Sequence, residues 1–184
     1  MKELSLNLLD IAENSVRAGA TLTKLLITET PELFTMEITD NGCGMTAEVL
    51  RGVTDPFYTT RKTRKVGMGL PLLRLAAEQT GGEMTVTSVS EKDCPDRHGT
   101  TVRAIFRKTH IDFTPPGDLA STVVTLIQGH PDTDFLFRHT MPEKTVELDT
   151  RELRDRLGEV PLNNYEVIVW IGEYLREQYN AENK

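Results

Sequence analysis

The sequence lacks the features that mark membrane-spanning, secreted or nucleic-acid-binding proteins. Its 184 residues contain no run of about 18 apolar residues that could cross a bilayer. Charged residues interrupt the N-terminus, where a signal peptide has an apolar stretch. Positive charge is not in excess either, because the formal net charge is −7, and broad nucleic-acid binding needs a basic surface. These absences predict a cytoplasmic protein that contacts neither membranes nor nucleic acid.

Cysteine is also scarce. The two cysteines, Cys43 and Cys94, are far apart in the sequence and lack the spacing of a metal site. In a cytoplasmic protein such residues are expected to be free thiols. The remaining composition is typical of a folded protein, with 38% hydrophobic and 27% charged residues. This composition and length suit one domain, or one domain with an appendage.

The first part of the chain alternates between helical and strand-like periodicity. We expect a helix that ends at Gly19, a helix that begins after an N-cap at Thr46, and a long polar loop over 54–69. The order of elements predicts an α+β fold, a two-layer α/β sandwich with a mixed sheet. The predicted helices cover 3–18, 46–53 and 70–80, and the predicted strands cover 21–29, 33–40, 83–90 and 100–108.

The pattern changes after about residue 110, and the sequence "PPG" at 115–117 interrupts the chain. Beyond it we expect helices at 118–129, 150–157 and 164–179 and a strand pair at 133–140 and 144–150. In the last helix, Val167, Ile171, Tyr174 and Leu175 fall on one side. We therefore predict a domain over 1–110 and an α+β C-terminal extension over 111–184 that packs on the core or serves as an interaction surface.

The first helix carries a polar stripe. At about 100° per residue, Asp10, Asn14 and Arg17 lie close together on the helix surface, and Glu13 lies toward the edge of the stripe. Taken alone, the stripe is compatible with a solvated helix face. The same amide, acid and base could also form the floor of a site.

Two glycine-containing loops follow. "DNGCGM" at 40–45 comes directly after a strand, and it suits either a hairpin turn or a ligand wall in which Asp40 accepts a hydrogen bond. "VGMGLPLLR" at 66–74 places Gly67 and Gly69 before a helix, where free backbone N–H groups can bind an anion. Four cations, at 61, 62, 64 and 65, precede it and form either a solvated charge run or part of a phosphate site.

Together these motifs resemble the ATP-binding domain of the GHKL superfamily, the Bergerat fold of DNA gyrase, the heat-shock chaperone of the ninety-kilodalton class, histidine kinases and MutL. "ENSVRAGAT" is similar to the N box and "DNGCGM" to the G1 box. "DPFYTTR" is similar to the F box of histidine kinases, "GMGLPLLR…TGG" to the G2 box, and Gly99-Thr100 to the last box. The resemblance covers about residues 3–108 and implies a mixed sheet covered by helices on one face.

The resemblance also implies roles for individual residues. Asp40 would accept a hydrogen bond from the adenine amino group with support from Thr100, and Asn14 would bind Mg²⁺. Arg17 would contact phosphate, in a position where histidine kinases often carry lysine. Two departures concern the phosphate loop, where Lys65 and Pro71 stand in place of glycines. The other residues expected around ATP are Gly42, Gly44, Met45, Phe57, Arg61, Lys62, Gly67, Met68, Gly69 and Leu70.

Catalysis depends on an acid four residues before Asn14. Hydrolytic members of the superfamily carry a glutamate general base there, so Asp10 is the candidate base and Glu13 is its rival. The sequence predicts either transfer of the γ-phosphoryl group of ATP to water or to a partner protein, or a non-catalytic ATP-dependent switch. An anti-sigma-factor-type serine kinase shares the fold, and a homodimer is possible. None of the four histidines, His98, His110, His130 and His139, lies in a predicted helix like that of a phosphorylated histidine.

Overall fold

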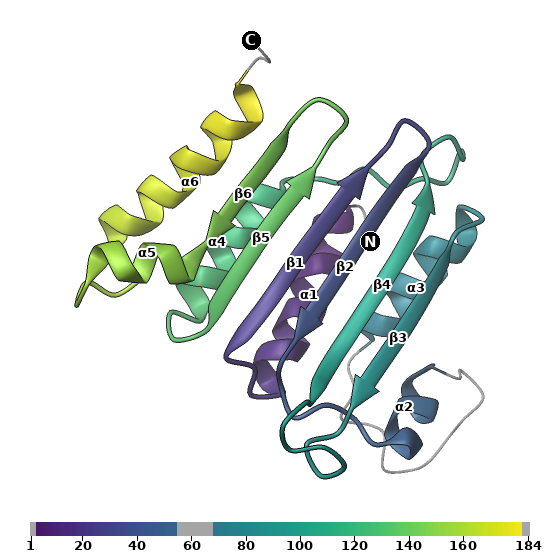
Figure 1. Ribbon diagram of the computed structural model, residues 1–184. Helices are drawn as coiled ribbons and strands as arrows, with labels where there is room; N and C mark the ends of the chain where they lie inside the picture. Colours follow the sequence, from purple (N-terminus) through teal and green to yellow (C-terminus); the bar gives the residue numbers. More distant parts are fainter. Residues whose placement is uncertain (1–2, 55–67, 182–184) are drawn as a thin grey trace.

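A computed structural model describes residues 3–54 and 68–181 of the chain. Figure 1 shows one sheet with helices along it, and the order of elements is the predicted one. The helices are α1 (Leu4–Arg17), α2 (Ala47–Thr54), α3 (Gly69–Gln79), α4 (Leu119–Gly129), α5 (Thr150–Leu157) and α6 (Tyr165–Asn180). The strands are β1 (Leu22–Glu29), β2 (Leu33–Asp40), β3 (Glu83–Val89), β4 (Gly99–Arg107), β5 (Asp134–Thr140) and β6 (Thr145–Asp149).

The sheet is mixed, as predicted. Its strand order is β3-β4-β2-β1-β5-β6. Strands β1 and β5 are parallel, whereas the other neighbouring pairs are antiparallel. The segment predicted as a C-terminal extension therefore adds β5 and β6 to the same sheet as the N-terminal strands. The division into segments 1–110 and 111–184 stays a prediction about domains, but the backbone hydrogen bonds of the sheet run across it.

The core lies between the sheet and the helices α1, α3 and α4. In Figure 1 these helices lie behind the sheet, whose other face is toward the viewer. The burial of β2 alternates, with Phe34, Met36 and Ile38 buried, as the alternation of apolar and polar residues predicts. The side chain of Phe34 packs edge-on against Phe106 of β4, with ring centroids 6.1 Å apart. This contact joins β2 and β4 at the end of the two strands that is remote from the loop after Asp40.

The ends of several elements confirm the local predictions. Gly19 has a φ of +76° just after α1, which is the left-handed conformation expected of a C-terminal glycine. The Thr46 hydroxyl accepts a hydrogen bond from the Val49 N–H at 3.4 Å and caps α2. Pro71 lies in the first turn of α3, where its missing N–H costs no helical hydrogen bond.

The proline-rich break at 115–117 has a structural role that the sequence did not indicate. The N–H groups of Leu4 and Ser5, at the start of α1, donate to the carbonyl oxygens of Pro115 and Pro116 at 3.0 and 2.8 Å. The first turn of a helix leaves such donors without partners in the helix itself. A segment more than a hundred residues away therefore caps α1 and holds it on the sheet.

Candidate functional site

A cavity of about 320 Å³ opens where α1, the end of β2 and the start of α3 meet. It contains many of the residues that the sequence motifs indicated. The polar side chains are Asn14, Ser15, Arg17, Asp40 and Thr100, and the other lining residues are Ile11, Ala18, Cys43, Gly44, Met45, Leu70 and Val102. Four of the sequence motifs, with lining residues that run from Asn14 to Thr100, thus line one cavity.

Two hydrogen bonds orient the carboxylate of Asp40 in the cavity wall. Ser15 Oγ donates to Asp40 Oδ2 at 2.7 Å, and the Gly42 N–H donates to Asp40 Oδ1 at 2.9 Å. A carboxylate has about four lone-pair positions for donors, so each oxygen of Asp40 can accept a further hydrogen bond. The carboxylate is therefore held in place and still able to accept from a ligand.

No sequence motif indicates a role for Ser15. It is 3% exposed and lies in the interior of α1, one residue after Asn14. A buried serine inside a helix usually returns its hydroxyl to the helix backbone, and Ser15 Oγ also lies 3.4 Å from the Ile11 carbonyl oxygen. Only the placement of β2 beside α1 shows that the principal hydrogen-bond partner of the Ser15 hydroxyl is Asp40.

Two glycines are required by the close approach of strands around the cavity. Gly44 has a φ of +65°, and a Cβ atom added there would lie 1.9 Å from the Val89 carbonyl oxygen. Gly99 has a φ of +139°, and a Cβ atom there would lie 2.0 Å from the Asp40 carbonyl oxygen. Any other residue would push these strands apart. The glycines of the two motifs therefore serve the packing of the loop against the sheet end.

Ser88 joins the loop after β2 to the start of β4. Its hydroxyl accepts from the Met45 N–H at 2.8 Å and lies 2.8 Å from the Thr100 hydroxyl. Thr100 is directly opposite Asp40 in the register of β2 and β4. Thr100 thus lies beside Asp40 at the end of the sheet, and its hydroxyl bonds to Ser88; its support of an adenine contact stays a prediction. Ser88 is a second positioning residue that the motifs did not reveal.

The start of α3 lies against the polar stripe of α1. A Cβ atom added to Gly69 would lie 3.3 Å from Asp10 Cβ and 3.8 Å from Asn14 Nδ2. The backbone at Gly69, in the predicted phosphate loop, thus lies next to these two side chains, and the anion site stays a prediction. Leu70 lines the cavity, whereas the side chain of Met68 is 73% exposed.

The two candidate bases have different surroundings. Glu13 Oε1 lies 2.8 Å from Nε2 of His130, just beyond α4, so this carboxylate is already paired on the side of α1 that faces α4. Asp10 is exposed and forms no ion pair within residues 3–54 and 68–181. The expected positions Phe57, Arg61, Lys62 and Gly67 lie outside the described residues.

Comparison with known proteins identifies the family. Residues 1–110 match the family described as "Histidine kinase-, DNA gyrase B-, and HSP90-like ATPase". A "Putative sensor protein" of Shewanella frigidimarina (strain NCIMB 400) is 31% identical over 103 residues, which is 54% of this chain but 15% of the relative's length.

Solved structures agree on the fold. The Aquifex aeolicus MutL ATPase domain complexed with ADP superposes with a TM-score of 0.51 at 16% identity, over 85% of this chain and 68% of that one. The N-terminal domain of a DNA repair protein gives a TM-score of 0.54 at 17% identity, over 81% of this chain and 53% of that one. None of the helices in the described part of the chain is long and apolar enough to span a bilayer. Motifs, fold and family match together show that the chain belongs to the histidine kinase-, gyrase B- and HSP90-like ATPases, the GHKL superfamily.

Proposed function

We propose that this chain binds Mg²⁺–ATP in the cavity between α1, β2 and α3 and transfers its γ-phosphoryl group to water or to a partner protein. The observation that carries the proposal is the carboxylate of Asp40, which Ser15 and Gly42 hold in the cavity wall with acceptor positions to spare. The adenine amino group is a donor that fits this acceptor. A guanine would present a carbonyl oxygen in its place and repel the carboxylate, so we expect preference for ATP over GTP.

The rest of the cavity suits the remaining parts of the nucleotide. Ile11, Met45, Leu70 and Val102 provide apolar walls for a planar base. Asn14 supplies a side-chain oxygen on the floor, which is the kind of ligand that Mg²⁺ prefers. The MutL domain with a similar fold holds ADP, which supports a nucleotide as the ligand here.

The phosphates would lie at the N-terminal end of α3. Its first backbone N–H groups have no partner within the helix and carry partial positive charge. Arg17, which lines the same cavity, adds a full positive charge. Asn14, which lines the same cavity, would hold Mg²⁺, and the ion would supply positive charge against the phosphates.

Asp10 is the proposed general base. It lies one helical turn from Asn14 and beside Gly69, whereas Glu13 is paired with His130. An attacking water would give a proton to Asp10 and form a bond to the γ-phosphorus as the bond to the ADP oxygen breaks. With a protein acceptor, the hydroxyl or imidazole of that protein takes the place of water, as in the serine-kinase version of the proposal.

The histidines of this chain are poor acceptors. His139 lies in β5, His130 caps the C-terminal end of α4, and His110 follows β4 in a turn. The ring of His98 is 2.5 Å from the Gly42 carbonyl oxygen. None of them lies within a helix, so we favour water or a separate protein as the acceptor.

The test follows labelled γ-phosphate from ATP into free phosphate and into added proteins, with nucleotide affinity measured in parallel. We expect Asp40→Asn to weaken ATP binding by roughly 10- to 150-fold, the equivalent of about 1.5–3 kcal/mol for a charged hydrogen bond. Asp10→Asn should keep the affinity and lower turnover by about 10²- to 10⁴-fold. Glu13→Gln is the matched control and should retain turnover.

The outcomes separate the two functions. Tight ATP binding without Mg²⁺-dependent turnover would contradict the enzyme and leave the conformational switch. Wild-type protein that does not bind ATP would contradict both.

A further inference from the structure

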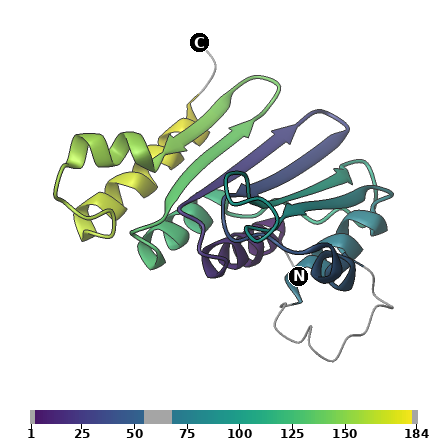
Figure 2. The same cartoon turned by 60° about the horizontal axis from the view of Figure 1, so that its bottom comes forward.

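The last helix, α6, exposes aromatic side chains at the end of the molecule opposite the nucleotide cavity. In Figures 1 and 2, α5 and α6 lie beyond β6 at one end of the sheet, and α2 and α3 lie at the other. Trp170 is 46% exposed and is the single tryptophan of the chain, and Tyr174 is 37% exposed. Their rings stack with centroids 4.9 Å apart and an angle of 13° between the planes.

This exposure departs from the sequence prediction. Tyr174 was expected on the same side of the helix as Val167, Ile171 and Leu175, which are buried at 8%, 0% and 0% exposure. Instead it lies at the margin of that side and stacks on Trp170. Large exposed aromatic side chains cost solvation free energy and are concentrated at protein interfaces. The pair therefore marks a surface rather than an incompletely buried core.

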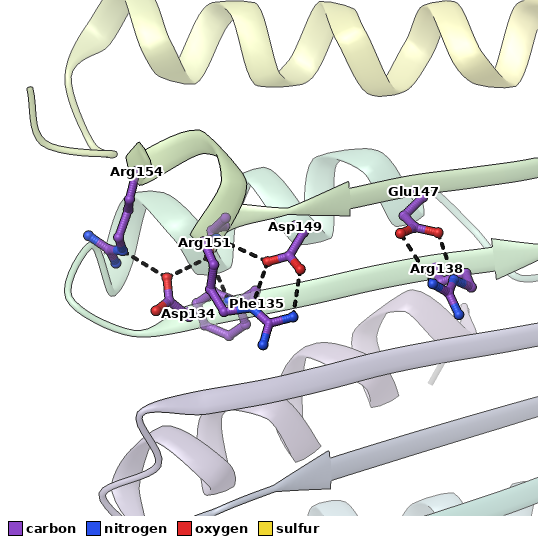
Figure 3. Close-up of polar contacts among 8 residues, drawn as sticks. Asp134, Phe135, Arg138, Glu147, Asp149, Arg151 and Arg154 are labelled. Atoms are coloured by element: carbon purple, nitrogen blue, oxygen red, sulfur yellow. Dashed lines mark hydrogen bonds and ion pairs between the residues drawn. The ribbon is translucent and has the colours of Figure 1, made fainter. Parts of the chain in front are cut away.

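The stacked pair forms one wall of a groove of about 260 Å³. We name it the α6 groove, and its other walls come from β6 and α5, including Glu147, Asp149, Glu152 and Arg156. Figure 3 shows that two of these carboxylates are already paired, Glu147 with Arg138 at 2.6 Å and Asp149 with Arg151 at 2.6 Å.

The groove does not offer a free strand edge. Strand β6 is the last strand of the sheet, but the side-chain amide of Gln178 closes it. Gln178 Oε1 accepts from the Glu147 N–H, and Gln178 Nε2 donates to the Glu147 carbonyl oxygen, both at 3.0 Å. An added strand would have to displace both bonds. A partner in the groove would therefore be recognised by its side chains.

Negative charge lies along the same helix. Glu166, Glu173 and Glu177 are exposed on the outer face of α6, beside the aromatic pair, and form no ion pair with another described residue. Residues 141–181 contain nine acidic and five basic residues, a net charge of −4 out of −7 for the whole chain. An exposed π face flanked by unpaired carboxylates favours a cation, above all an arginine, because its guanidinium can stack and pair at once.

We propose that the α6 groove binds a basic segment of a partner protein, with an arginine stacked on Trp170 and paired with carboxylates of α6. The same charge argues against two other occupants. A second copy of this chain would bring an equally acidic face, and anionic lipid headgroups would be repelled. The surface lies in the segment beyond the family match, so it is independent of the nucleotide cavity.

The single tryptophan makes the groove directly observable. The probe is a short peptide that alternates arginine, leucine and serine, compared with versions that carry lysine or glutamate in place of arginine. Saturable quenching or a spectral shift of Trp170 fluorescence is expected with the arginine peptide, weaker with lysine and absent with glutamate. Binding should weaken steeply as salt rises, because the carboxylates are exposed.

Variants are compared by the anisotropy of the labelled arginine peptide. Trp170→Ala is expected to weaken binding about tenfold and Glu173→Gln about threefold, in line with cation–π and exposed ion-pair energies, while Trp170→Phe retains most of it. Leu75→Ala, at 51% exposure on α3, is the apolar control, and Glu91→Gln is the control with the same change in net charge. Thermal unfolding of each variant confirms that it is folded.

Several results would overturn the proposal. They are the absence of saturation, equal effects of Glu91→Gln and Glu173→Gln, or unchanged binding in Trp170→Ala. Self-association that Trp170→Ala abolishes would show that a second copy occupies the groove. Vesicle binding that depends on Trp170 would assign the surface to a membrane.

Discussion

The two ends of the sheet differ in how completely their polar side chains are paired. At the nucleotide end, Asp40 is oriented by Ser15 and Gly42 but keeps acceptor positions directed to a cavity. At the β5–β6 end, the charged side chains of the two strands form ion pairs with arginines, as Figure 3 shows. Asp134 accepts from Arg154 at 2.7 Å and from the Thr150 hydroxyl at 2.9 Å. Incomplete pairing of a fixed group marks a binding site, whereas complete pairing serves the fold.

The comparison also explains why motifs were visible in only one half. A site needs particular residue types at particular places, so the nucleotide end carries ordered motifs. The β5–β6 end needs only complementary pairs and a continuous core, which many sequences can provide. Its exposed aromatic pair on α6 is the exception, and for that reason it is the surface that we propose to be functional.

The largest expected effect comes from removing the second region. A chain shortened to residues 1–110 would lose Phe135, Phe137 and the Pro115–Pro116 cap of α1. Loss of one buried phenylalanine costs about 3–5 kcal/mol, and a whole domain is stable by only about 5–15 kcal/mol. We expect no cooperative thermal unfolding transition by circular dichroism.

The matched control is a chain that ends after Asn180, which should unfold as the full chain does. A cooperative transition in the shortened chain would show instead that residues 1–110 are an independent domain. The two ends of the sheet would then belong to separate domains, and their different pairing of polar side chains would be a difference between domains.

A smaller effect is expected from the residue that orients Asp40. Ser15→Ala removes one of two hydrogen bonds to the carboxylate, and hydrogen bonds to charged groups contribute about 1.5–3 kcal/mol. ATP affinity measured by calorimetry should fall roughly tenfold or more, with little change in turnover at saturating ATP. Ser121→Ala, which removes the hydrogen bond from the Ser121 hydroxyl to Asp118 Oδ2 at the start of α4, far from the cavity, should leave the affinity unchanged.

The smallest expected effect is a pH dependence of stability. His139 is 3% exposed, between Glu29 and Tyr179 at 2.9 Å each, and burial is the main cause that lowers the pKa of its imidazole. The imidazole of His139 then binds a proton more readily in the unfolded chain than in the folded protein. The contribution of this group to the free energy of unfolding is therefore fully present above pH 6.5 and falls as the pH drops below it. Each unit of lowered pKa costs about 1.4 kcal/mol at acidic pH.

His139→Gln removes this titration and should flatten the dependence of the free energy of unfolding between pH 7 and pH 5. Denaturant unfolding at several pH values measures it. Equal slopes in the variant and the wild type would assign the acid sensitivity to another group. His110→Gln, a change in an exposed turn, is the control for histidine loss itself.

Much of the fold could be predicted because its signals are local. Helical and strand periodicity gave the order and nearly the bounds of the elements, and Gly19 and Thr46 ended and began helices as expected. The pairing of β5 with β1 could not be predicted, because a parallel neighbour is chosen by packing across the whole chain. The position of Tyr174 at the margin of its helix depended in the same way on where α6 meets α4 and β6.

The sequence by itself determined the family and the mixed α+β fold, and it predicted the residues of the candidate nucleotide site, since these follow from ordered motifs and short-range periodicity. Tertiary structure decided the rest. It paired Ser15 with Asp40 across 25 residues and Glu29 with His139 across 110, and it placed Pro115 and Pro116 at the start of α1. Such contacts join residues that are far apart in the sequence. Their partners are set only when the sheet and helices pack, so no local sequence pattern predicts them.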